Sequence, residues 1–125
     1  MRYQILVDLF RSARGDASLV VLEGFHPLKH AIRFGAELVE AVTANLAELS
    51  KLASGYAPDI MPTLHQRVMV VPAQVFLQLA PVPPPTGVIA IAQRPKVSLS
   101  EMLNNPAPAP VVLLENPRNL LNIGA

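Results

Sequence analysis

Four side chains that can carry positive charge are spaced for one face of a helix early in the chain. They are His26, Lys29, His30 and Arg33, at positions i, i+3, i+4 and i+7, which are neighbours on a helical surface. Cationic side chains neutralise phosphates and release counterions, so this row predicts salt-sensitive RNA binding with little sequence preference. An ordinary solvated helix face explains the same spacing, and both interpretations stay open.

The two histidines of this row also have the spacing of two metal ligands on a helix. Catalytic zinc usually takes three protein ligands. No nearby Asp, Glu or Cys stands at a spacing that would complete a site around His26 and His30. We therefore expect no metal here.

Other basic residues could extend an RNA-binding surface, namely Arg11, Arg14, Arg67 and Arg94. The first two close a predicted helix, and the last two flank a stretch without charged residues. Residues 36–62 carry one basic and four acidic side chains, whereas residues 63–96 carry three basic and none acidic. A polyanion would thus meet a surface with a basic and an acidic side, although random placement of so few charges explains the pattern equally well.

The chain lacks the motifs of several enzyme classes. It has no cysteine, so disulfides, thiolate zinc sites and cysteine nucleophiles are excluded. A Gly-x-Ser-x-Gly elbow, a dinucleotide-binding glycine motif and a phosphate loop are absent as well. No two carboxylates form a convincing acid/base pair. On these grounds, these 125 residues are not expected to do covalent chemistry alone.

Hydrophobic periodicity predicts the helices and strands that carry these basic residues. It predicts helices over 1–14, 27–34, 46–53 and 73–80, strands over 19–22, 38–43, 68–71 and 87–92, and a brief helix through Leu103. Asn45 is the expected cap of the third helix, and Gly55 its expected end. The residues between 53 and 68 read as a loop that contains prolines.

This order predicts an α/β fold, specifically a three-layer α/β/α sandwich around a mostly parallel four-stranded sheet, because parallel neighbours need long crossovers. The last strand, apolar on both faces, is expected to be central. Hydrophobic residues make up 51% of the chain and charged residues 15%, as a well-buried sheet requires. The charge-free stretch contains too many prolines for a membrane-spanning helix. We expect no membrane association and, by default, a cytoplasmic location.

Prolines at 106, 108 and 110 indicate a semi-rigid spacer, so the chain divides into a domain over 1–104, a linker over 105–110 and a start of a second domain over 111–125. After the strand-like run 111–114 comes an Asn-Pro turn and then Asn122-Ile123-Gly124-Ala125. This ending resembles the first motif of the SpoU/TrmH-type RNA ribose 2'-O-methyltransferases, in which an arginine follows three positions later. Val20-Val21-Leu22-Glu23-Gly24 and Thr86-Gly87-Val88-Ile89-Ala90 resemble, less specifically, features of that family's substrate-recognition domain.

The resemblance implies an RNA-binding domain that is similar in fold to kink-turn-binding ribosomal proteins. The parent enzyme would methylate a ribose 2'-hydroxyl of tRNA or rRNA with S-adenosylmethionine and form a homodimer through its catalytic domain. Asn122 would belong to the catalytic site of that parent. These 125 residues alone are expected to hold no cofactor and to be inactive. A standalone RNA-binding module is the alternative, and a protein-interaction domain the third hypothesis.

Overall fold

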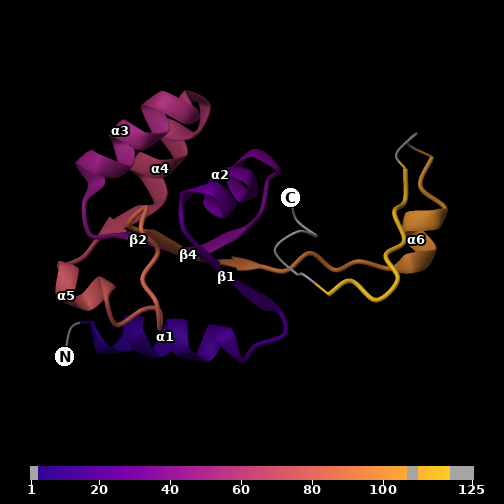
Figure 1. The fold of residues 1–125 in the computed structure, drawn as a ribbon, viewed down its shortest axis with the longest axis horizontal. Helices are drawn as coiled ribbons and strands as arrows, with labels where there is room; N and C mark the ends of the chain where they lie inside the picture. Colours follow the sequence, from indigo (N-terminus) through magenta and orange to yellow (C-terminus); the bar gives the residue numbers. More distant parts are fainter. Residues whose placement is uncertain (1–2, 107–109, 119–125) are drawn as a thin grey trace. The chain divides into compact units, whose positions relative to one another are not determined.

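A computed structural model of the chain describes residues 3–106 and 110–118. The chain forms two compact units, Met1–Pro95 and Lys96–Ala125. The first unit contains a four-stranded sheet and the helices around it (Figure 1). Its elements are α1 (Gln4–Arg14), β1 (Leu19–Glu23), α2 (Phe25–Arg33), β2 (Leu38–Thr43), α3 (Leu46–Tyr56), the 3-10 helix η1 (Pro58–Ile60), α4 (Met61–Arg67), β3 (Val68–Val70), α5 (Ala73–Phe76) and β4 (Val88–Gln93).

Between α3 and β3 the structure replaces the expected loop with two helices, η1 and α4. Pro58 and Pro62 lie in the first turns of these helices, where a missing backbone N–H leaves no hydrogen bond unmade. The predicted cap is confirmed, since the Asn45 side chain accepts a hydrogen bond from the Glu48 N–H at 3.1 Å. The predicted end of α3 at Gly55 is wrong, because the helix continues to Tyr56.

The sheet is mixed, with strand order β1-β4-β2-β3. β4 runs antiparallel to both β1 and β2, and only β2 and β3 pair in parallel. The α/β class and the four strands were predicted correctly, whereas the mostly parallel sheet was wrong. β4 does occupy the centre, and its residues from Val88 to Ala92 are all buried.

The connection from β3 to β4 explains the antiparallel direction. The Val71 N–H donates to the Thr43 carbonyl at 2.9 Å, and the Thr43 hydroxyl donates to the Gly87 carbonyl at 2.6 Å. The connection therefore begins and ends at the same end of β2. Its one helix, α5, has four residues and a length of about 6 Å, too short to carry the chain back along the sheet.

Buried apolar residues form one cluster on each face of the sheet. Ile89 and Ile91 of β4 belong to a cluster with residues of α1 and α5. Val88 and Ala90, which point the other way because side chains alternate along a strand, belong to a cluster with residues of α2, α3 and α4. In Figure 1, α1 and α5 accordingly lie on the opposite side of the sheet from α2, α3 and α4.

The turn from β1 into α2 depends on Gly24. Its φ of 109° and ψ of 173° lie in a region that is essentially restricted to glycine. A Cβ atom at this position would lie 3.1 Å from the Thr86 hydroxyl oxygen. That oxygen accepts the Phe25 N–H at 2.8 Å and thereby satisfies an N–H group at the start of α2.

Gly24→Ala is expected to lower the free energy of unfolding by about 1–3 kcal/mol, because alanine is strained at this φ and ψ. Gly55→Ala is the matched control. Gly55 lies inside α3, and no atom lies within 4 Å of the place that a methyl group would occupy, so alanine there should raise stability by about 0.5–1 kcal/mol. Chemical denaturation of both variants measures the difference. Equal stabilities would contradict the role given to Gly24.

The second unit contains one short helix, α6 (Leu99–Leu103), within its described residues. The Ser98 side chain caps it by accepting the Glu101 N–H at 3.4 Å. The expected strand over 111–114 is not formed, and the four apolar side chains of this segment are exposed. A strand needs a neighbour for its backbone hydrogen bonds, and these residues pair with none of the described strands. The motif Asn122–Ala125 lies outside the described residues.

Candidate nucleic-acid interface

Helix α2 presents the predicted basic row and buries the opposite side of the helix. Phe25 and Leu28 are buried in the cluster under α2. His26 and Arg33 are exposed or partly exposed, as are Lys29 and His30. The helical spacing in the sequence thus correctly predicts which side of α2 faces solvent.

The exposed side of α2 also carries a row of rings. The His26 and His30 rings meet edge to face with centroids 4.5 Å apart. The His30 and Phe34 rings are stacked, with centroids 6.1 Å apart and planes at 16°. Phe34 is 84% exposed, which is unusual for a phenylalanine. Sequence reasoning assigned Phe34 only as the end of the helix, although the spacing 26, 30, 34 already indicates a row of rings.

The two permanent cations of α2 have different surroundings. Arg33 forms a two-pronged ion pair with Asp59 of η1, with Nε–Oδ2 at 2.8 Å and Nη2–Oδ1 at 2.7 Å. The hydrogen bond to Asp59 raises the pKa of Arg33, and the same bond lowers the pKa of the Asp59 carboxyl. Lys29 forms no salt bridge among the described residues, although its charge adds to the lowering of the pKa of Asp59, and its Nζ lies 6.0 Å from the centroid of the Phe25 ring. Of these two cations, Lys29 is therefore available to a ligand, and Arg33 joins α2 to η1.

The charged neighbours of His30 oppose its protonation. Partial desolvation lowers the pKa of His30, and the positive charges of His26, Lys29 and Arg33 lower it further. A phosphate placed beside this ring would reverse that balance, because a nearby negative charge favours the protonated form. Among the described residues no group of three or more His, Cys, Asp or Glu side chains could hold a metal ion.

The other predicted arginines lie outside α2, and each of them bonds to the protein itself. Arg14 pairs with Glu23 at 2.7 Å and donates to the Leu79 carbonyl at 3.0 Å. The Arg94 side chain donates to the Leu19 carbonyl at 3.1 Å, which joins β4 to β1. Arg11 pairs with Asp8, one turn earlier in α1, at 3.3 Å. These contacts give the three arginines local structural roles and do not add them to the row on α2.

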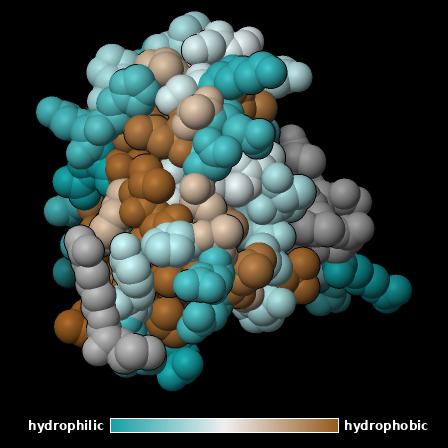
Figure 2. Space-filling view, turned by 90° about the vertical axis from the view of Figure 1, so that its left-hand side faces the viewer, coloured by the Kyte–Doolittle hydropathy of each residue, from teal (hydrophilic) through white to brown (hydrophobic). Residues whose placement is uncertain are grey.

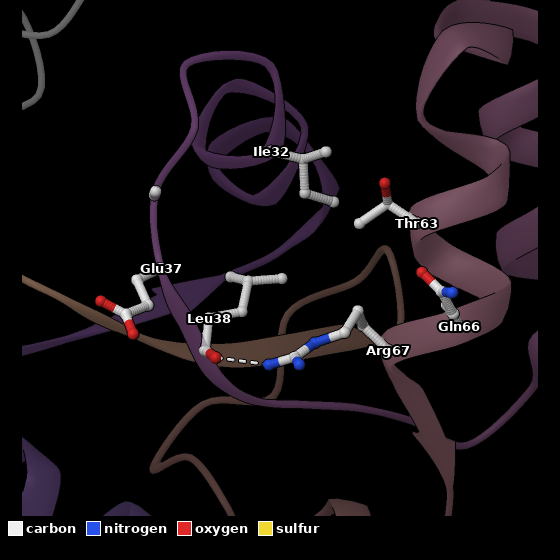
Figure 3. A pocket seen from close by; sticks show the side chains of 7 residues that line it. Ile32, Glu37, Leu38, Thr63, Gln66 and Arg67 are labelled. Carbon is white, nitrogen blue, oxygen red and sulfur yellow. Dashed lines mark hydrogen bonds between the residues drawn. The ribbon is translucent and has the colours of Figure 1, made fainter.

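Arg67 lines a hollow of about 330 Å³ between α2, β2 and α4. Its side chain extends from α4 to donate to the Leu38 carbonyl, while the Glu37 side chain points away from the Arg67 guanidinium (Figure 3). Thr63 and Ile32 face each other across the opening (Figure 3). A guanidinium that already bonds to a carbonyl and shares the hollow with Glu37 is a weak site for a phosphate.

The surface beside the edge strand β3 has a different character. Hydrophobic residues form a band down the face shown in Figure 2. A hollow of about 390 Å³ lies between α1 and β3, and its lining consists of Tyr3, Ile5, Leu6, Leu9, Glu40, Met69 and Val70. Its one charged residue is a carboxylate, so it does not suit a polyanion. Elsewhere, no helix within the described ranges is both long enough and apolar enough to cross a bilayer.

Comparisons with known proteins do not assign this chain to a family. No family model matches the sequence, and no curated protein matches it.

Proposed function

We propose that the first unit binds RNA through the exposed side of α2. The observation that carries this proposal is the row of rings made by His26, His30 and Phe34, with Lys29 beside it. Exposed rings next to cations are how proteins hold unpaired nucleotides, because bases stack on the rings and phosphates meet the charges. An ordinary solvated helix face gives no reason for an exposed phenylalanine that extends a row of stacked rings.

Contacts in the first unit support the wider proposal, a substrate-recognition domain of a SpoU/TrmH-type methyltransferase. The two sequence features that resemble this family come together, since the Thr86 hydroxyl accepts the Phe25 N–H next to Gly24, and the Gly24 N–H donates to the Val88 carbonyl at 3.0 Å. In this proposal the fold is a three-layer sandwich similar to kink-turn-binding ribosomal proteins, with a mixed sheet.

The catalytic part of the proposal rests on the resemblance of residues 111–125 alone. The parent would be a homodimeric cytoplasmic enzyme that transfers a methyl group from S-adenosylmethionine to tRNA or rRNA, with Asn122 in its catalytic site. The cofactor site would be formed by parts of the parent other than the first unit. A standalone RNA-binding module remains the alternative.

Titration of the protein against a structured RNA at about 50 mM and about 200 mM salt tests RNA binding. A surface that contacts a few phosphates should bind at low salt and lose affinity steeply as salt rises. On a duplex, a plot of log K against the logarithm of the salt concentration should fall with a slope of about 0.9 for each phosphate contacted. Phe34→Ala should weaken binding by about fivefold or more, in line with the contribution of one stacked base. Absence of binding at low salt would contradict the proposal.

A further inference from the structure

Strand β3 is the more accessible of the two edges of the sheet. No strand of the described residues pairs with its outer side. Met69 and Val70 are 38% and 50% exposed, whereas the residues of the opposite edge strand β1 are half-buried from Leu19 to Leu22. Sheet edges are commonly protected by charged side chains, prolines or bulges, and β3 has none of these within its three residues. This edge is therefore open to a further strand.

The backbone of β3 is oriented for such pairing. The Val71 N–H donates to the Thr43 carbonyl of β2 at 2.9 Å. Successive N–H groups of an extended chain point in opposite directions, so the N–H and carbonyl of Val70 face away from β2. An extended peptide can add to a sheet edge through such groups. Because β3 is short, this pairing forms few hydrogen bonds, and side chains must supply the rest of the affinity.

The hollow of about 390 Å³ beside β3 can take one of those side chains. Its lining includes Leu6, which is buried, and Ile5, which is 80% exposed. Met69 also lines it and is in register with Val42, a residue of the cluster under α1, so this side of β3 faces α1. Alternate side chains of an added strand would point to this same face. An apolar side chain of that strand would find apolar contacts here, in the hydrophobic band of Figure 2.

One carboxylate in this lining gives the hollow a preference for charge. Glu40 is the only charged residue of the lining, and it is half-buried. One of its oxygens accepts the Ala41 N–H at 3.2 Å, and its carboxylate forms no salt bridge among the described residues. A partly buried negative charge attracts a cation more strongly than a fully solvated one does. The hollow therefore complements an apolar side chain that is accompanied by a lysine or an arginine.

We infer that β3 and this hollow bind an extended segment of a partner protein. The segment adds to β3 as a further strand, places an apolar side chain in the hollow, and directs a lysine or arginine two residues away toward Glu40. This inference does not depend on the proposed RNA binding. The hollow lies on the α1 side of the sheet and the ring row on the α2 side, so both surfaces can be occupied at once (Figure 1).

Three synthetic peptides of strand length test the inference on the 125-residue chain. The first alternates valine with threonine and carries one lysine in place of a valine. The second has glutamate in place of that lysine, and the third has proline in place of the central threonine. Fluorescence anisotropy of the labelled peptides at low salt measures the affinities. We expect saturable binding of the lysine peptide, at least about tenfold weaker binding of the glutamate peptide because like charges meet, and a similar loss for the proline peptide, which lacks a backbone donor.

Substitutions locate the peptide. Ile5→Gln should weaken the lysine peptide by about tenfold, the scale of one buried isoleucine side chain, and should leave RNA binding unchanged. Because Ile5 is exposed, this variant should melt at the temperature of the unmodified protein. Phe34→Ala is the reciprocal control, since Phe34 is equally exposed but lies at the end of α2, and it should leave the peptide affinity unchanged.

A second pair of variants tests the charge preference. Glu40→Gln should bring the lysine and glutamate peptides to nearly equal affinity. The glutamine oxygen can still accept the Ala41 N–H, so the fold of the strand is kept. Glu37→Gln is the matched control, because Glu37 lines the other hollow, beside Arg67, and this variant should keep the full difference between the two peptides.

Each contrary outcome identifies the part that is wrong. If the lysine peptide shows no saturable binding, or if Glu40→Gln keeps the difference between the charged peptides, the site is wrong. Equal binding of the proline peptide would rule out strand addition. If the protein alone sediments as a dimer that Ile5→Gln converts to a monomer, the occupant is a second copy of the chain, and a partner segment is wrong. Failure of RNA binding would leave all of these results unchanged.

Discussion

The affinity of the protein for RNA is expected to rise by about tenfold or more as the pH falls from about 8 to about 5.5. His30 stands beside His26 on the proposed RNA surface, and the His30 ring gains a positive charge when it is protonated. A rise of one unit in the pKa of a histidine on binding corresponds to a tenfold gain in affinity once that histidine is protonated. Titrations against one RNA hairpin across this pH range measure the change.

The direction follows from the pKa of His30. In the free protein desolvation and neighbouring cations lower this pKa, so His30 is neutral at about pH 8. Phosphates raise the pKa of His30 in the complex. The affinity therefore increases as the pH falls through the pKa of His30 in the complex and then through its pKa in the free protein, and it levels off below the latter. The Arg33–Asp59 pair stays ionised throughout, because it raises the pKa of Arg33 and lowers that of Asp59.

A substitution assigns the pH dependence to the His30 ring. His30→Gln should leave the affinity nearly constant with pH. His65→Gln provides the same change on α4, where His65 contacts Ser50 at 3.0 Å, and should keep the full dependence. A pH response that survives in His30→Gln would show that other groups, in the protein or the RNA, take up the proton.

Ile89→Ala is expected to lower the free energy of unfolding by about 2–5 kcal/mol, as large-to-small changes in a core do. Ile89 has no exposed surface and lies in a central strand of the sheet, packed in the cluster with α1 and α5. The strands on both sides prevent the backbone from closing the space that the side chain leaves. Denaturant titration measures the loss.

Val70→Ala is the control for this change, since Val70 belongs to the edge strand and is half exposed. Its effect should stay within about 0.5 kcal/mol, as is usual for surface positions. If both variants lost the same stability, the distinction between the central and the edge strand would be wrong.

The sequence predicted well those features that depend on neighbouring residues. Every helix and strand expected in the first unit overlaps an observed element, because apolar periodicity and caps such as Asn45 are local signals. The direction of β4 was mispredicted, because it depends on the contact of Thr43 with Val71 and Gly87, far apart in sequence. Helix α4 was missed because its proline was read as a loop residue and not as part of the first turn of a helix.

In the candidate site, too, features set by neighbouring residues were predicted, and features set by distant contacts were not. Helical spacing correctly grouped His26, Lys29, His30 and Arg33 on one side of α2. Which cations are free was not predictable, because the partners of Arg14, Arg33 and Arg94 come from distant parts of the chain. Arginine bonds readily to carboxylates and carbonyls within the fold, so a count of basic residues overestimates the surface available to RNA.

Thr43 holds both ends of the connection that precedes β4, one through its carbonyl and the other through its hydroxyl. Extra residues inserted near Val82, which is 77% exposed, would therefore bulge outward without shifting the register of any strand. Doubling the length of such a closed segment costs only about 0.6 kcal/mol in entropy. This makes the stretch around Val82 a suitable place to graft a foreign peptide or a fluorescent tag.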